Sequence, residues 1–190
     1  MEENTDQELI DLHLKGDQKA FNLLVKRYSK NIYNFAVKLN NKNNAEDIVQ
    51  EIFIKVWQKI KSFDQNKSSF KTWLFTIARN TIIDFSRKKK FLLFSDFFQK
   101  DEDTLYENIP DEQILPDEAL QKLQDFQILK EIIDKLKPKY KEVVILHYQE
   151  DLTFEEISKI LKKPLNTVKS QNRRALEQIR NLLENAPNYQ

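Results

Sequence analysis

The residue types in this sequence that could do chemistry are those that bind phosphate and nucleobases, and one group of them lies between Thr72 and Lys90. At about 100° per residue, hydroxyl, amide and guanidinium groups gather on one face of a helix predicted to begin near Phe70. The cations Arg87 to Lys90 follow directly. The helix dipole explains the cations but not the mixed polar face before them. We therefore expect this face to contact a phosphate backbone through Thr76, Arg79, Asn80, Ile83, Arg87 and Lys88.

A polar loop precedes this helix, from Phe63 to Ser69, and Phe63 and Phe70 place an aromatic ring at each margin. An unstacked nucleobase can be held between an aromatic ring and amide groups. The loop is therefore a candidate for capturing a base from a separated strand.

The helix predicted from Asn44 to Ile60 carries a second unusual face. Asn44 is expected to cap it, and Asp47 adds a favourable charge near the positive end of the helix dipole. Asp47, Gln50 and Glu51 gather around Ile54 on the side opposite the apolar stripe. Such a face fits a basic protein partner. A solvated face with one stray apolar residue is equally compatible with the spacing.

The C-terminal residues from Asp151 onward predict a helix-turn-helix. Thr153 and Glu156 form a capping box, a tight turn follows at 162–165, and Asn166 is expected to cap a long basic helix. The alternative is a solvated basic helix in a bundle. In a helix-turn-helix the polar residues near the start of the second helix contact duplex DNA, here Thr167, Lys169, Ser170, Arg173 and Arg174. Asn172 projects from the apolar side and needs hydrogen-bond partners if it is buried.

Composition excludes several classes of site. The chain has 190 residues, one glycine (Gly16), no cysteine and two histidines, so glycine-rich phosphate loops, disulfides and thiolate metal sites are ruled out. His13 and His147 have no triad-like or metal-ligand spacing, and we predict no catalytic residue, metal or cofactor. No apolar run approaches the length of a membrane span. The expected location is the cytoplasm.

Charge is segregated along the chain although the net charge is only +1. Two basic blocks, 79–90 and 162–180, flank an acidic block at 101–118 that contains no basic residue. Helical periodicity on both sides of this block predicts an all-α protein with two small domains. We place the first domain at 1–90, an irregular acidic linker at 91–116, and a second domain ending in the helix-turn-helix at 117–190. The Phe-rich segment 91–98 has no assigned role.

The sequence resembles the bacterial RNA polymerase sigma factors of the small extracytoplasmic-function group over nearly its whole length. The N-terminal matches are DQELIDLHLKGDQKAFNLLVKRY, AEDIVQEIFIKVW and FKTWLFTIARNTIIDFSRKKK. The C-terminal match is LKPKYKEVVILHYQEDLTFEEISKILKKPLNTVKSQNRRALEQIR. Two positions depart from the family pattern: Asn172 stands where the family is usually apolar, and Lys162 occupies a turn site often held by glycine.

The resemblance implies a role for each stretch. The helix with Asp47, Gln50, Glu51 and Ile54 would dock on the clamp of the largest subunit of core RNA polymerase. The loop and helix from Phe63 to Lys90 would melt the minus-ten promoter element and capture a flipped base through Phe63, Asp64, Asn66, Phe70, Asn80 and the basic end. The helix from Asn166 to Leu183 would read the minus-thirty-five element as duplex.

The leading hypothesis is thus an alternative sigma factor and not an enzyme. Its partners would be core RNA polymerase and promoter DNA, both duplex and single-stranded, without membrane insertion or a small-molecule substrate. The resemblance also permits an anti-sigma factor as a partner. The competing hypothesis is a two-domain helix-turn-helix regulator that acts without stable polymerase association. An enzyme on a helical scaffold has no support from any residue constellation.

Overall fold

The computed structural model describes residues 4–40, 44–95 and 128–184, with the side chains of residue 40 and of 88–95 outside this description. Every regular element in these ranges is helical, which confirms the predicted all-α class. We call residues 4–95 the N-terminal half and 128–184 the C-terminal half. The start of the helix predicted near Asp117, and most of the predicted linker, lie outside the described residues.

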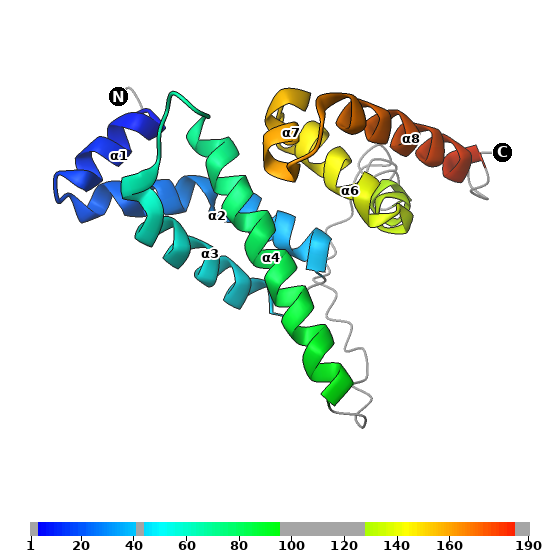
Figure 1. Cartoon of the computed structure of the whole chain (residues 1–190), viewed down its shortest axis with the longest axis horizontal. Helices are drawn as coiled ribbons and strands as arrows, with labels where there is room; N and C mark the ends of the chain where they lie inside the picture. The colour runs from blue at the N-terminus through cyan, green and yellow to red at the C-terminus, as the bar shows by residue number, and fades with distance from the viewer. Residues whose placement is uncertain (1–3, 41–43, 96–127, 185–190) are drawn as a thin grey trace, which may run out of the picture.

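The N-terminal half contains four α-helices. They are α1 (Asp6–Leu14), α2 (Gln18–Asn40), α3 (Ala45–Lys59) and α4 (Phe70–Ser95), with a 3₁₀ turn at Ile60–Ser62. A capping box of Thr5 and Glu8 starts α1, and the Asp17 carboxylate accepts a hydrogen bond from the Lys19 amide at the start of α2. Helices α2, α3 and α4 pack around one another, and the lower part of α4 projects beyond them (Figure 1).

The C-terminal half is smaller. Residues 128–135 are helical and precede α6 (Pro138–Val144), a π-helical turn η2 (Ile145–Gln149), α7 (Phe154–Leu161) and α8 (Leu165–Glu184). Pro138 is the first residue of α6. The capping box of Thr153 and Glu156 is formed at the start of α7. Helices α7 and α8 give the predicted helix-turn-helix.

The structure differs from the predicted helix ends at three places. Asn44 precedes α3 in a left-handed conformation, with φ of 72°, and its side chain makes no capping hydrogen bond. Asn166 does not cap α8, because the helix already begins at Leu165 and the Pro164 carbonyl accepts hydrogen bonds from the Thr167 and Val168 amides. Helix α4 continues to Ser95, which lies within the stretch 91–116 that we assigned to the linker.

The two halves share one hydrophobic core, which the sequence did not predict. Side chains of α4 such as Leu74 and Ile77 belong to the same buried cluster as Val143, Leu146 and Ile157 of the C-terminal half. Helix α4 packs directly against α7, and α2 contacts α6 (Figure 1). A second, smaller cluster of Leu136, Tyr140, Val144 and Ala175 holds α6 on α8. One face of α4 is therefore covered by the C-terminal half.

Candidate nucleic-acid interface

The outward face of α3 combines carboxylates with exposed apolar side chains. Asp47 and Gln50 are exposed and Glu51 is half-exposed, where Glu51 pairs with Lys55 over 3.3 Å. Ile54 is 50% exposed, and Trp57, one turn further along α3, is 56% exposed. Sequence reasoning missed Trp57, although its spacing of three residues from Ile54 was a usable signal. Large apolar side chains left in water between acidic groups are typical of a protein-binding surface.

The loop before α4 is ordered by its own polar side chains. The Asp64 carboxylate accepts the Asn66 backbone amide over 3.0 Å and the Asn66 side-chain amide over 3.2 Å, and it pairs with Lys67 over 3.3 Å. The hydrogen bond from the Asn66 backbone is the largest cause holding the pKa of Asp64 below its ordinary value. Asp64 therefore orders this turn as a carboxylate, and Asn66 remains exposed.

The two aromatic residues at the loop margins pack on each other. The rings of Phe63 and Phe70 meet edge to face at 5.7 Å, and each also contacts Trp73. Tyr28 of α2 closes the group against Phe70. Phe70 is buried, whereas Phe63 is only half-buried. Phe63 is thus the more exposed of the two rings, and it packs against the buried Phe70.

The outer face of α4 is divided between solvent and the C-terminal half. Asn80 and Arg87 are exposed. Arg79 is paired with Glu142 of α6, and Thr76 donates to the Thr72 carbonyl over 2.8 Å. Ile83 and Arg87 line a pocket of about 270 Å³ together with Pro138 and Glu142. Lys88 lies within α4, but its side chain is outside the described residues.

The helix-turn-helix presents its basic side to solvent. Thr167, Lys169, Arg173 and Arg174 are exposed and Ser170 is half-exposed, all within the first half of α8. The turn itself is strained, because Lys162 ends α7 with a φ of 52° in the left-handed region that favours glycine. Asn172 is buried at 8% exposure and faces Tyr148. The polar side chain that we expected on the apolar side of this helix is thus buried in the core.

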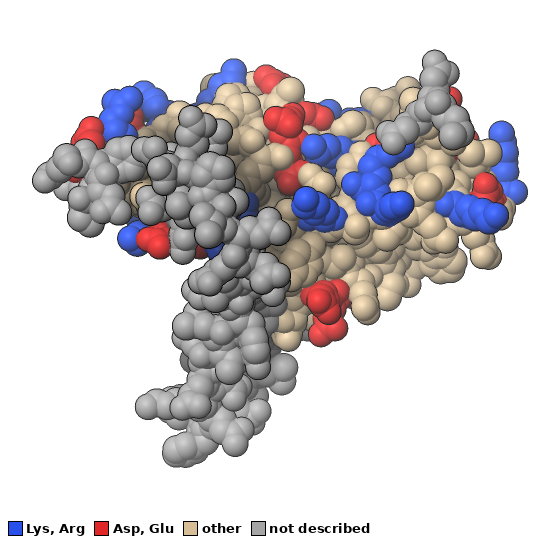
Figure 2. Space-filling view, turned by 180° about the vertical axis from the view of Figure 1, so that it is seen from behind, with Lys and Arg blue, Asp and Glu red and all other residues tan. Residues whose placement is uncertain are grey.

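Surface charge, possible metal ligands and helix length further restrict what the molecule can bind. Figure 2 shows Lys and Arg side chains in several separate groups on one side of the molecule. The described ranges contain no cluster of three or more His, Asp or Glu that could hold a metal ion. None of the helices within the described part of the chain is both long and apolar enough to cross a membrane. The arrangement leaves three separate candidate surfaces, on α3, on the loop with α4, and on α8.

Comparison with known proteins identifies the family. Residues 24–91 match the family described as Sigma-70 region 2, and residues 126–179 match Sigma-70, region 4. The chain is 39% identical to the ECF RNA polymerase sigma factor SigW of Bacillus subtilis over 89% of this chain and 91% of SigW. The chain belongs to the ECF RNA polymerase sigma factors. It is also 32% identical to the ECF RNA polymerase sigma-E factor of Haemophilus influenzae, over 96% of this chain and 97% of that protein.

A solved structure agrees with this assignment. The sigma factor RpoE of Bartonella quintana, determined in complex with the anti-sigma factor NepR, is 26% identical, with a TM-score of 0.70 over 88% of this chain and 98% of RpoE. The chain is therefore an alternative sigma factor that directs promoter recognition and transcription initiation, with core RNA polymerase and promoter DNA as its partners. This confirms the leading hypothesis from the sequence over the regulator that acts without polymerase. Sigma factors are regulatory initiation factors.

Proposed function

We propose that three surfaces of this sigma factor bind three different targets, and that α3 binds core RNA polymerase. The observation that carries this assignment is the half-exposed Ile54 and Trp57 beside Asp47, Gln50 and Glu51. Apolar anchors surrounded by charge are the usual form of a binding hot spot, and the acidic groups select a basic partner. We assign to this face the clamp of the largest polymerase subunit.

The loop at 63–69 and the outer face of α4 bind the minus-ten element as separated strands. Phe63 is the half-buried ring of the pair and packs on the buried Phe70, and Asp64 and Asn66 order the loop beside them. Thr76, Arg79, Asn80, Ile83, Arg87 and Lys88 follow along α4 to hold the strand. Stacking of a flipped base and phosphate contacts offset the few kcal/mol needed to unpair it. DNA melting thus needs no catalytic residue, and the protein is not an enzyme.

The exposed start of α8 reads the minus-thirty-five element as duplex. Thr167 and Ser170 supply hydroxyls, and Lys169, Arg173 and Arg174 supply cations, at the end of the helix that a helix-turn-helix inserts into the major groove. The domain limits remain those proposed from the sequence, 1–90 and 117–190 with a linker at 91–116, and the protein acts in the cytoplasm. An anti-sigma factor is a further proposed partner, supported by the likeness to RpoE solved with NepR.

Run-off transcription with purified core polymerase tests the proposed roles of these three surfaces. We expect promoter-dependent transcripts from templates of the cognate genome only when the protein is added. Charge reversal on α3 should lower them at every promoter by weakening polymerase binding, whereas Arg173→Ala should lower them at promoters that depend on the minus-thirty-five element. The absence of any promoter-dependent transcript would overturn the proposal.

A further inference from the structure

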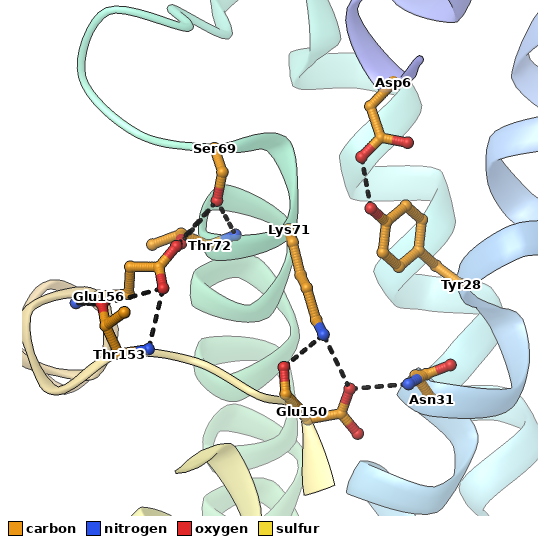
Figure 3. Close-up of polar contacts among 9 residues, drawn as sticks. All are labelled: Asp6, Tyr28, Asn31, Ser69, Lys71, Thr72, Glu150, Thr153 and Glu156. Atoms are coloured by element: carbon orange, nitrogen blue, oxygen red, sulfur yellow. Dashed lines mark hydrogen bonds and ion pairs between the residues drawn. The ribbon is translucent and has the colours of Figure 1, made fainter. Parts of the chain in front are cut away.

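A series of contacts joins α1 to the loop at which we propose that a base is captured. Tyr28 of α2 is the middle of this series. Its hydroxyl donates to Oδ2 of Asp6 in α1 (Figure 3), and its ring packs against Phe70 at the start of α4, with 5.6 Å between the ring centroids. Phe70 in turn packs on Phe63 at the start of the loop. The series therefore links α1, α2, α4 and the loop.

Asp6 is itself held in place by other contacts. It lies in the first turn of α1, directly after the Thr5 cap. Its second oxygen, Oδ1, accepts a hydrogen bond from Nη1 of Arg27, and Nη2 of Arg27 donates to the Asn4 carbonyl over 2.6 Å. A guanidinium bound at two points restricts the rotation of the carboxylate. The oxygen that accepts the Tyr28 hydroxyl is therefore fixed relative to α1.

The Tyr28 hydroxyl is a hydrogen-bond donor in this arrangement. Burial raises the pKa of Tyr28 well above its ordinary value, and the hydrogen bond to Asp6 adds to the rise. The phenol therefore stays protonated at physiological pH. A phenylalanine would fill almost the same space, so what the hydroxyl adds is a fixed direction of the ring.

Aromatic packing extends this fixed direction to the loop. In an edge-to-face contact the edge of one ring is attracted to the face of the other, so the orientation of one ring limits that of the next. The planes of Tyr28 and Phe70 meet at 63°, and those of Phe70 and Phe63 meet at 88°. Phe70 is only 4% exposed, and Trp73 contacts both phenylalanine rings. The orientation of the half-buried Phe63 thus depends on that of Tyr28.

All of these contacts lie within the N-terminal half. We infer that Asp6 and Tyr28 are positioning residues for minus-ten recognition, which together set the orientation of the Phe63 ring on which a flipped base stacks. Helix α1 thereby contributes to base capture without touching DNA. This inference rests on the proposed function of the loop at 63–69. Asp6 precedes the residues that match Sigma-70 region 2, which begin at residue 24, so it adds a contribution from outside the matched segment.

Tyr28→Phe tests the inference, because it removes the hydroxyl and keeps the ring. Tyr33→Phe is the matched control, since Tyr33 lies on the same helix and its partly exposed hydroxyl has no hydrogen-bond partner among the described residues. Each full-length variant is combined with core polymerase and titrated with two fluorescein-labelled probes of equal length, a pool of random single-stranded DNA and an abasic strand. The ratio of the two affinities, which we call the base ratio, measures what the bases contribute beyond the phosphates.

We expect Tyr28→Phe to lower the base ratio about fivefold, because a base stacks less well on a ring that is no longer held in one orientation. Affinity for the abasic strand should be unchanged, and Tyr33→Phe should alter neither affinity. Asp6→Ala, which removes the acceptor from α1, should lower the base ratio as far as Tyr28→Phe does. An equal loss of affinity for both probes would show that the pair only supports the fold, and would overturn the inference.

A double-mutant cycle with Phe63→Ala shows whether Tyr28 acts through Phe63. We expect Tyr28→Phe to leave the base ratio of Phe63→Ala unchanged, because the ring that Tyr28 positions is then absent. The same fall in both backgrounds would refute the positioning role while leaving base capture by Phe63 intact. A failure of the proposed function gives a different result. If the wild type binds both probes equally well and Phe63→Ala has no effect, base capture at this loop is refuted, and the inference with it.

Discussion

The side-chain amide of Asn172 donates to the Tyr148 hydroxyl over 3.4 Å, while its carbonyl oxygen is buried without a hydrogen-bond partner among the described residues. A buried polar atom without a partner costs about 1–3 kcal/mol. Asn172 therefore weakens the contact between α8 and η2, at the base of the proposed recognition helix.

Asn172→Leu should stabilise the protein by about 1–3 kcal/mol, since it removes the unpaired oxygen and extends the apolar side of α8. Urea unfolding at neutral pH measures the change. Asn166→Leu, at an exposed position of the same helix, is the control and should change stability little. A loss of stability on Asn172→Leu would show that the weak Tyr148 contact outweighs the unpaired oxygen.

Lys162→Gly should stabilise the helix-turn-helix by about 1 kcal/mol, because Lys162 adopts a φ of 52° that costs a side chain about this much. Lys162→Val should destabilise it, since β-branching makes the left-handed region less accessible. Thermal unfolding of both variants provides the measurement. Lys163→Gly, at the neighbouring position without positive φ, should lower stability instead.

Asp47→Lys and Glu51→Lys should each weaken binding to core polymerase by about tenfold or more, because reversal places like charges against a basic partner. The loss of the Glu51–Lys55 pair contributes little, as both side chains are partly exposed. Surface-immobilised core polymerase gives the affinities. Glu131→Lys, with the same charge change in the C-terminal half, is the matched control. Unchanged affinity of the α3 variants would remove this face from the interface.

Arg173→Ala should weaken binding to minus-thirty-five duplex by about 1–3 kcal/mol if Arg173 reads a base edge. Its exposed pair with Glu177, at 3.6 Å, contributes little to the fold. Arg180→Ala, further along α8, should have a much smaller effect. Competition among duplexes that differ at single base pairs distinguishes the modes of contact. A loss that is equal on all sequences would assign Arg173 to a phosphate instead.

Two carboxylates of the C-terminal half that contact the N-terminal half should give opposite pH dependence. Burial raises the pKa of Glu150 above 4.5, despite hydrogen bonding from Asn31 and the charges of Lys71 and Lys38. Its favourable contribution is complete below the unfolded pKa and is lost as the pH rises through the folded one. For Glu156, burial raises the pKa, but the hydrogen bonds from Thr153, Thr72 and Ser69 outweigh it and lower the pKa below 4.5. Its contribution is present above the unfolded pKa and is lost as the pH falls.

Glu150→Gln should therefore become more stable relative to wild type as the pH rises from about 4 to about 7, and Glu156→Gln should become less stable over the same range. Urea unfolding at several pH values measures both differences. The same sign for both variants, or no dependence on pH, would contradict the assigned environments.

Local sequence patterns predicted the elements well. The capping box of Thr153 and Glu156 was correctly predicted, because it depends on residues only a few positions apart. The family resemblance located the candidate surfaces on α3, α4 and α8. Helix ends were less predictable. Asn44 and Asn166 have the right residue type for a cap, but backbone geometry decides whether a cap forms.

The contact between the halves could not be predicted from periodicity. Thr72 and Arg79 were expected on a solvent-facing side of α4, and their spacing does not reveal partners on α6 and α7 that are 63 and 84 positions away. Glu142, Glu150 and Glu156 likewise carried no signal beyond that of ordinary acidic helix residues. Such pairings depend on tertiary packing rather than on local sequence.

The exposed Trp57 also makes the docking face of α3 observable. The chain has two tryptophans, and the other, Trp73, is half-buried in the aromatic group with Phe63 and Phe70. Biosynthetic fluorotryptophan would therefore give two ¹⁹F resonances, one from each environment. Docking on polymerase should move the Trp57 resonance by removing its water, and capture of a base at the loop should move that of Trp73. The two binding events can thus be followed separately in a single spectrum, against the fluorine-free background of the polymerase and DNA.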